Sequence, residues 1–479
     1  MGKISIPAVI KEYAGRDKNI LKGGVEMPAI CDLTKMKNVY FAGIGGISMS
    51  SLALILKNKG IAVSGYDFKE SATTKMLEDN GIKIDYTYED AVFPDADTVV
   101  YTAALGDDDP ILVSARERGL DIFTRAELLG AITGDYRHSV GVAGTHGKST
   151  TTGMLAEICL AADNDSTVLA GAVMPSVGST FTVGGGDCAV FEACEYKNSY
   201  HSMCPTIKTI LNVELDHVDF FGNLENVIDS FRKYIAKPGK NGENIAVINL
   251  DSQNAVEAAK DTGADVKYFS IKDKTDYYAQ SIDLSDGYGE FDILKGEGLL
   301  CHVKLSVPGI HNVSNAVSAA ASADLCGIDA EAIKAGLERF IGVKRRFEKV
   351  MTLSSGAIVI DDYAHHPDEI TVTLNSAKKV ARGKVICIFQ PHTYSRTKAL
   401  FDDFVKALSL ADKVLMAPIY AARETDTLGV SSDDVAKSIE NAESFYSFDE
   451  LKERAEELAQ KGDLVITMGA GDVYKVFQK

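Results

Sequence analysis

The sequence has no uninterrupted apolar run long enough to cross a bilayer, and its first residues, MGKISI, lack the apolar core of a signal peptide. Positive charge is scarce: the formal net charge is −18, so nucleic acid is not an expected partner, and an anionic substrate would need a local basic pocket. Repeats of short period are also missing, which excludes a solenoid. We therefore expect a chain that does not insert into membranes and that forms about three globular domains from its 479 residues.

The cysteines lack any pattern. The eight are scattered along the chain, and no two have the C-x-x-C spacing. This argues against a zinc knuckle and against a disulfide framework, and it favours a reducing, cytoplasmic location. Most of the cysteines are expected to be small buried side chains.

The stretch SVGVAGTHGKSTTTGMLAEICL, residues 139–160, has the layout of a phosphate-binding loop. An apolar strand is followed by a glycine-rich turn, and then apolar residues repeat at helical spacing. Glycines let backbone N–H groups approach phosphate oxygens, and the start of the helix contributes its positive dipole end. Lys148 would reach the outer phosphates and the Ser149 hydroxyl would ligate Mg²⁺. The predicted nucleotide-binding residues here are Gly144, Thr145, His146, Gly147, Lys148, Ser149 and Thr150.

This loop departs from the general pattern G-x-x-x-x-G-K-[ST], because Val142 occupies the position of the first glycine. The alternative reading is a glycine-rich turn that binds nothing.

A second glycine-rich turn follows the strand expected at 38–42, and Asp67 comes just after the next strand. The pattern nearly matches G-x-G-x-x-G with an acidic residue about 20 positions later, except that Ser48 replaces the third glycine. It predicts a diphosphate site, for a dinucleotide or a UDP-sugar, at Gly45 and Gly46. Asp67 would bind a ribose. Residues 1–37 show no clear period and are interpreted as an N-terminal extension.

Acidic and imidazole side chains follow two further strands. Glu192 follows the strand 188–191, and the cluster 214–219, which includes His217, follows the strand 209–213. The carboxyl ends of parallel strands lie at one edge of a sheet, so we expect these groups near the phosphate loop. Carboxylate and imidazole are reasonable ligands at a Mg²⁺ site. Ordinary surface acids on loops are the alternative.

Three more groups of polar residues lie further along the chain. His311, Asn312 and Asn315 precede a helix of small residues and could bind the edge of a purine, or could merely cap that helix. Arg345 and Arg346 are an adjacent pair that could clamp phosphate. The strands expected at 357–360 and 384–389 end in DDYAHHP and QPHTYSR. We therefore predict a second Rossmann-type sheet in this region.

These motifs together resemble the Mur ligase family. They are GIGGISM at 43–49, GTHGKSTTT at 144–152, EACEY at 192–196, NVELDHVDFF at 212–221, PGIHNVSNAVSAA at 308–320, GVKRRFE at 342–348, DDYAHHPDEI at 361–370, FQPHTYSRT at 389–397 and YAARE at 420–424. They cover residues from about 38 to 475 in the family's order. The resemblance implies an α/β fold of three domains: a Rossmann-like UDP-sugar domain at 38–137, a central ATP-binding domain at 138–341, and a Rossmann-like amino-acid domain at 342–479.

The resemblance also implies an activity. The signatures of the third domain point to the member that joins L-alanine to the lactyl carboxylate of UDP-N-acetylmuramate, using ATP and an acyl-phosphate intermediate, in peptidoglycan precursor synthesis. It implies two Mg²⁺ ions and a monomer or homodimer. Three alternatives stay open at this point: a recycling ligase that adds a peptide to the same sugar nucleotide, an NAD-dependent oxidoreductase built on residues 38–67, and a non-catalytic nucleotide sensor.

The resemblance assigns roles residue by residue. Lys148 would support the β- and γ-phosphates, and Ser149, Glu192 and His217 would hold the metal ions. His311, Asn312 and Asn315 would lie at the adenine, while Arg346 and Asp361 would contact ATP. Tyr363, His365 and Arg396 would face the substrate carboxylates. The implied catalytic residues are Lys148, Glu192, His217, His365 and Arg396.

Two positions depart from the family pattern. Thr393 stands where many relatives have arginine, and EACEY stands where relatives often have EADES.

Overall fold

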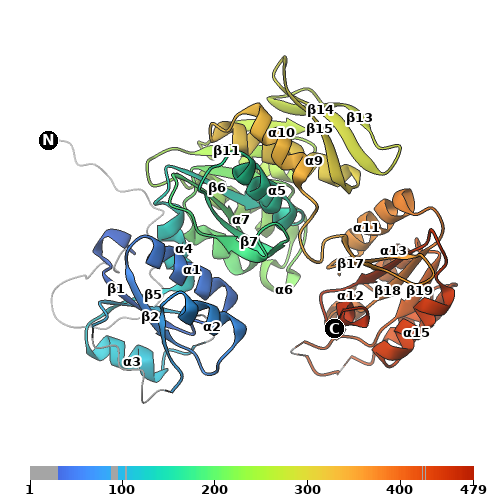
Figure 1. Ribbon diagram of the computed structural model, residues 1–479, viewed down its shortest axis with the longest axis horizontal. Coiled ribbons are helices and arrows are strands. Elements are labelled where there is room, and N and C mark those ends of the chain that lie inside the picture. The colour runs from blue at the N-terminus through green and yellow to red at the C-terminus, as the bar shows by residue number, and fades with distance from the viewer. Residues whose placement is uncertain (1–30, 88–94, 103–104, 423, 427, 479) are drawn as a thin grey trace.

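The computed structural model describes residues 31–87, 95–102, 105–422, 424–426 and 428–478. They form three α/β domains in chain order, each built on its own sheet (Figure 1). The predicted α/β class and three-domain architecture are confirmed. No helix in the described parts of the chain is long and apolar enough to span a membrane.

The N-terminal sheet is entirely parallel, with the strand order β3-β2-β1-β4-β5. Its strands are β1 (Asn38–Ala42), β2 (Ala62–Tyr66), β3 (Lys83–Asp85), β4 (Thr98–Tyr101) and β5 (Asp121–Thr124). Its helices are α1 (Ile47–Asn58), α2 (Ala72–Asp79), α3 (Pro110–Glu117) and α4 (Arg125–Thr133). The short 3-10 helix η2 (Leu33–Lys35) precedes β1, and Leu33 and Met36 are buried in the core of this domain. The last residues of the expected extension therefore pack on the domain, while residues 1–30 lie outside the described chain.

The middle sheet has ten strands in the order β15-β14-β13-β12-β11-β10-β6-β9-β7-β8. Strands β6, β7 and β9 to β13 run parallel to one another. At one end of the sheet β8 pairs antiparallel with β7, and at the other end β13, β14 and β15 form two antiparallel pairs. The strands are β6 (His138–Ala143), β7 (Thr167–Met174), β8 (Ser179–Thr182), β9 (Cys188–Glu192), β10 (Ile207–Ile210), β11 (Ile245–Asn249), β12 (Asp265–Ser270), β13 (Tyr277–Asp283), β14 (Tyr288–Lys295) and β15 (Gly298–Pro308). The helical segments are α5 (Lys148–Ala161), η3 (Tyr196–Ser202), α6 (Val218–Phe221), α7 (Leu224–Ala236), α8 (Gln253–Ala259), α9 (Ile310–Leu325) and α10 (Ala330–Arg339).

The C-terminal sheet has the order β16-β17-β21-β18-β19-β20 and is parallel except for β16. Its strands are β16 (Glu348–Thr352), β17 (Ile358–Asp362), β18 (Val385–Phe389), β19 (Lys413–Met416), β20 (Ala442–Ser444) and β21 (Leu464–Met468). Its helical segments are α11 (Pro367–Val380), α12 (Tyr394–Ala399), α13 (Phe401–Leu408), α14 (Ser432–Lys437), α15 (Phe448–Leu458) and η4 (Val473–Val476).

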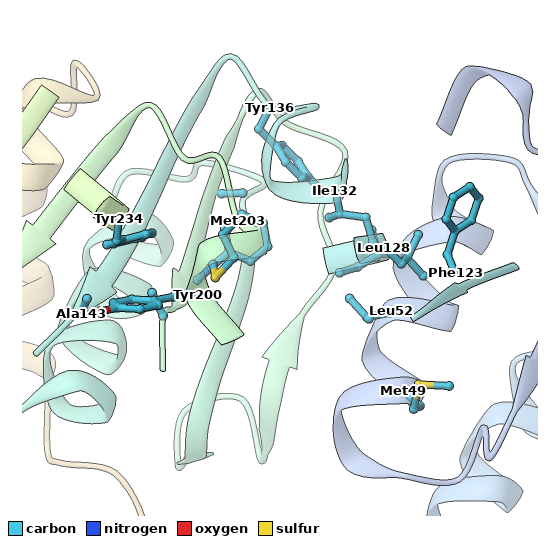
Figure 2. Close-up of a cluster of buried hydrophobic side chains, with 14 of the residues drawn as sticks. Met49, Leu52, Phe123, Leu128, Ile132, Tyr136, Ala143, Tyr200, Met203 and Tyr234 are labelled. Atoms are coloured by element: carbon cyan, nitrogen blue, oxygen red, sulfur yellow. The ribbon is translucent and has the colours of Figure 1, made fainter. Parts of the chain in front are cut away.

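The N-terminal and middle domains share one apolar cluster. Figure 2 shows it running from Leu52 of α1, through Leu128 and Ile132 of α4, to Tyr200 and Met203 beside the middle sheet. All five side chains are at most 1% exposed. The two clusters of the C-terminal domain, by contrast, consist of residues between Phe347 and Phe477. The first two domains are thus joined through a common core, and the third has a core of its own.

Helix α10 lies directly against α5, the helix that follows the phosphate loop. The contact is close because residue 336 is glycine: a Cβ there would collide with the backbone of Ile158 and of Glu157. Backbone atoms cannot move aside cheaply, so a side chain at this position must push the two helices apart.

Gly336→Ala should therefore lower stability by about 1–2 kcal/mol, because overpacking costs about 1–3 kcal/mol and outweighs the gain of up to about 1 kcal/mol in helix propensity. Thermal denaturation measures the change. Ala335→Ser, at the exposed neighbouring position, is the control and should leave the melting temperature nearly unchanged. A Gly336→Ala variant as stable as the control would contradict this account of the packing.

Candidate active site

A cleft of about 330 Å³ lies between the middle and C-terminal domains. The phosphate loop forms one wall with Glu192 and Glu214, and the start of α9 forms another. The C-terminal domain contributes Arg346 and residues of α11. The predicted nucleotide residues that line it are Thr145, His146, Gly147, Lys148, Ser149, Thr150, His311, Asn312, Asn315 and Arg346.

The phosphate loop connects β6 to α5 and is fastened to the end of β10. The backbone N–H of Thr145 donates to the Asn212 carbonyl (3.2 Å), and that of His146 donates to Asn212 Oδ1 (2.8 Å). Asn212 Nδ2 donates back to the His146 carbonyl (3.1 Å). Helix α5 starts at Lys148, after Gly147 with φ 86°, and has no side-chain cap. Its first N–H groups and positive dipole end are therefore available to a phosphate at the cleft.

Lys148 lies folded along its own loop. Its Nζ donates to the Gly144 carbonyl (2.5 Å) and the Thr145 carbonyl (3.0 Å), and it lies 3.0 Å from Glu195 Oε2. Burial by itself lowers the pKa of Lys148, but the negative charges of Glu195 and Glu192 outweigh it and the pKa is raised. Lys148 is therefore a cation at neutral pH. Glu195, the second acidic residue of EACEY, was not predicted as a site residue.

The Ser149 hydroxyl and Glu192 lie in contact. Ser149 Oγ donates to Glu192 Oε1 (3.1 Å), and the Gly171 N–H donates to Oε2 (2.6 Å). A hydroxyl and a carboxylate side by side at a phosphate loop fit the oxygen preference of Mg²⁺, whose other ligands are usually phosphate oxygens and waters. No three His, Cys, Asp or Glu side chains within the described ranges gather closely enough to hold a metal by themselves.

His217 lies beside Glu195. Its Nε2 is 3.9 Å from both Glu195 Oε1 and Asp216 Oδ2, and its ring centroid is 4.6 Å from that of Tyr196. The pairing of His217 with Glu192 at a second metal ion stays a prediction.

The predicted adenine-binding residues lie on α9. His311, Asn312 and Asn315 all belong to the first two turns of this helix, which begins earlier than the sequence indicated. Asn315 Nδ2 donates to Asn312 Oδ1 (3.1 Å), and Asn312 Nδ2 donates to the Pro308 carbonyl (2.8 Å). Burial lowers the pKa of His311 to about 4, so its ring is neutral at pH 7. A neutral ring and two amides suit recognition of a purine face and edge.

The structure does not bring Asp361 to the cleft, although the sequence predicted an ATP contact there. Its side chain is fully buried: Oδ1 accepts from Thr467 Oγ1 (2.6 Å) and Oδ2 from Arg345 Nε (3.1 Å). Asp362, the next residue, lines the cleft instead, because adjacent residues of β17 point to opposite faces of the sheet. Burial raises the pKa of Asp362 to about 6, against the lowering effect of Arg346.

The predicted carboxylate-binding residues come together at the ends of β17 and β18. The rings of Tyr363 and His365 are 5.4 Å apart, and His392 lies 6.2 Å from His365. Burial lowers the pKa of His365 to about 4, and the nearby Arg396 cation acts in the same direction. Arg396 follows Thr393, whose Oγ accepts the Arg396 N–H (3.4 Å) at the start of α12. Thr393 therefore caps the helix that carries the arginine.

The predicted sugar-nucleotide loop is braced by Asp67. Asp67 Oδ2 accepts the Gly45 N–H (2.7 Å), and the side chain is 8% exposed. A Cβ on Gly45 would lie 2.7 Å from the same oxygen. One carboxylate oxygen is therefore occupied in shaping the loop, and ribose binding by Asp67 stays a prediction. Gly46 is the N-cap of α1.

His146 connects the phosphate loop to the third domain. Its Nδ1 lies 3.2 Å from Glu369 Oε1 of α11, and its Nε2 lies 3.4 Å from Glu214 Oε2. Burial by itself lowers the pKa of His146, but hydrogen bonds and charge from Glu214 and Glu369 raise it to about 9. His146 is therefore protonated at neutral pH. No sequence pattern predicted this contact, since Glu369 reaches the loop only when two domains meet.

A pKa raised from about 6.5 to about 9 means that the His146 interaction stabilises the protein fully below pH 6.5. This stabilisation is lost as the pH rises through about 9, because His146 then loses its proton in the folded protein as it already has in the unfolded one. The protein should therefore melt at a higher temperature than a His146→Gln variant at pH 7, and the difference should shrink by pH 10. A difference that is the same at both pH values would contradict the charged state assigned to His146.

A phosphate loop that follows a strand with parallel neighbours, faced across a cleft by an arginine from a second α/β domain, defines a nucleotide-binding enzyme. The family models agree: "Mur ligase family, catalytic domain" matches residues 38–137, "Mur ligase middle domain" matches 142–323, and "Mur ligase, glutamate ligase domain" matches 345–471. The chain belongs to the Mur ligase family.

Its relatives cover nearly the whole chain. It is 45% identical over 448 residues to the UDP-N-acetylmuramate--L-alanine ligase of Caldicellulosiruptor saccharolyticus, covering 92% of this chain and 98% of the relative. It is 45% identical over 452 residues to the ligase of the same name from Lachnospira eligens, covering 93% and 98%. Among solved structures, the UDP-N-acetylmuramate-alanine ligase of Thermotoga maritima has a TM-score of 0.73 at 29% identity, covering 92% of this chain and 97% of that one.

Proposed function

We propose that this protein is an ATP-dependent ligase that joins L-alanine to the lactyl carboxylate of UDP-N-acetylmuramate by way of an acyl phosphate, in the synthesis of peptidoglycan precursors. The cleft carries the proposal: its phosphate loop faces Arg346 of the third domain, and Glu369, which lines the cleft, contacts His365, whose pKa Arg396 lowers. The names of the relatives, matched over more than nine-tenths of the chain, support the choice of substrates. Two Mg²⁺ ions, a cytoplasmic location and a monomeric or dimeric state belong to the same proposal.

Each of these groups has a task in the proposed reaction. When ATP binds, the Lys148 ammonium gives up its hydrogen bonds to the Gly144 and Thr145 carbonyls and contacts the outer phosphates instead. Ser149 and Glu192 hold Mg²⁺. ATP with Mg²⁺ supplies the phosphoryl group that turns the sugar carboxylate into an acyl donor, and the metal offsets the repulsion between the two anions. Arg396 provides a permanent positive charge for a substrate carboxylate, and neutral His365 provides hydrogen bonding beside it.

Release of phosphate from ATP should require UDP-N-acetylmuramate, L-alanine and Mg²⁺ together. The reason is that the acyl phosphate is consumed only when the amine of L-alanine attacks it. A coupled phosphate assay with each component omitted in turn measures this, and mass spectrometry of the product identifies the new amide. Phosphate release at the full rate without L-alanine would refute the proposed reaction. A faster reaction with a tripeptide than with L-alanine would instead identify a recycling ligase.

Lys148→Ala should reduce kcat by about 10²–10³, because it removes a positive charge from the phosphates in the transition state. Lys233→Ala is the control, since Lys233 is an exposed lysine of α7 that pairs with Asp229 away from the cleft. Its kcat should equal that of the unaltered protein. Comparable kcat values for the two variants would show that Lys148 takes no part in the reaction.

A further inference from the structure

Glu369 occupies the third position of α11, where it caps the start of the helix. Its carboxylate accepts the backbone N–H groups of His365 (3.0 Å) and His366 (3.3 Å). Such reciprocal caps are common at helix starts, and glutamine serves in them as well as glutamate does. Capping alone therefore does not require the negative charge of Glu369.

The same carboxylate contacts three groups that are cations or imidazoles. Oε1 lies 3.2 Å from His146 Nδ1 and 3.9 Å from Arg346 Nη1, and Oε2 lies 3.3 Å from His365 Nδ1. The Glu369 side chain is only 15% exposed. One carboxylate thus touches the phosphate loop, the arginine expected at the nucleotide, and the histidine expected at the amino acid.

Several acids line this cleft, and Glu192 has a task there as a predicted Mg²⁺ ligand, whereas Glu369 faces His146 and Arg346. Glu369 repels phosphate, so nucleotide binding by itself gives no reason for an acid here. The contact with His146 gives one. It is an ion pair between the middle domain and the C-terminal domain, across a boundary where the charges of His366 and Arg396 also act on Asp216.

The C-terminal domain depends on such contacts for its position. Its two apolar clusters are built from its own residues, whereas the N-terminal and middle domains share a cluster. A domain without a common core is held against its neighbour by the contacts at their boundary, and interfaces of this kind permit relative motion.

We propose that Glu369 is a positioning residue that holds the amino-acid domain on the phosphate loop through His146, and so sets His365 and Arg346 relative to the nucleotide. The consequence is a coupling between the two halves of the cleft: the His146–Glu369 contact brings the amino-acid site to the place where the acyl phosphate forms. The kinetic part of this inference rests on the function proposed above, and the part that concerns the domain arrangement does not.

Glu369→Gln tests the inference because glutamine keeps the helix cap and removes the charge. We expect the KM for L-alanine to rise about tenfold, within the range typical of coupling between sites. His146→Gln should have the same effect from the other side of the contact. The double variant should be no worse than either single variant, since both remove one interaction.

Glu450→Gln is the matched control. Glu450 also occupies the third position of a capped helix in the C-terminal domain, α15, where it accepts the N–H of Ser447 (3.2 Å), but it is paired within its own domain. Its kinetic constants should not change. An equal rise in the KM for L-alanine in Glu450→Gln and Glu369→Gln would overturn the inference, and so would additive losses in the double variant.

Small-angle X-ray scattering of the substrate-free proteins separates this inference from the proposed function. Glu369→Gln and His146→Gln should have a larger radius of gyration than the unaltered protein, and Glu450→Gln should not. An unchanged radius of gyration in both of the first two variants would overturn the inference. An increase in those two would support it even if the protein released no phosphate with L-alanine.

Discussion

The double hydrogen bond between Asn212 and His146 fixes the loop on which the remainder of the site depends. Asn212 stands at the end of β10 and accepts from, and donates to, the backbone of His146 in the loop after the adjacent strand β6. A glycine-rich loop is flexible on its own and costly to order, because glycine loses more conformational freedom on folding than other residues do. Fastening it to the neighbouring strand presets the start of α5, and with it the positions of Lys148 and Ser149. Glu192 reaches Ser149 from β9, the strand on the other side of β6.

The parts of the fold that the sequence predicted well are those with continuous apolar strands. Strands β1, β6, β9, β17, β18 and β21 are buried along almost their whole length, and such runs indicate parallel strands covered on both faces. The antiparallel strands β13 to β15 were not predicted. Strand β14 alternates buried and partly exposed residues because only one of its faces packs against the domain, so its apolar content per residue is low.

The residues of the site could likewise be predicted only where the signal lies within a short stretch of sequence. The phosphate loop and Glu192 could be found because a short motif or a strand end carries the signal. The choice between Asp361 and Asp362 could not be made, because it depends on which face of β17 turns toward the cleft. Glu369 could not be found either: it resembles an ordinary capping residue, and its contact with His146 spans 223 positions of sequence between two domains.

The apolar cluster shared by the first two domains has a consequence for how the chain can be divided. A chain ending near residue 137 would expose Leu128, Ile132 and Tyr136, which are now covered by the middle domain. The N-terminal and middle domains therefore share part of their apolar core, although each also has a cluster of its own. The C-terminal domain, whose apolar side chains cover one another, is the module that can be exchanged. Exchange of the C-terminal domain alone would therefore change which amino acid or peptide joins the sugar carboxylate. The sites for the sugar nucleotide and for phosphate, on the first two domains, would stay in place.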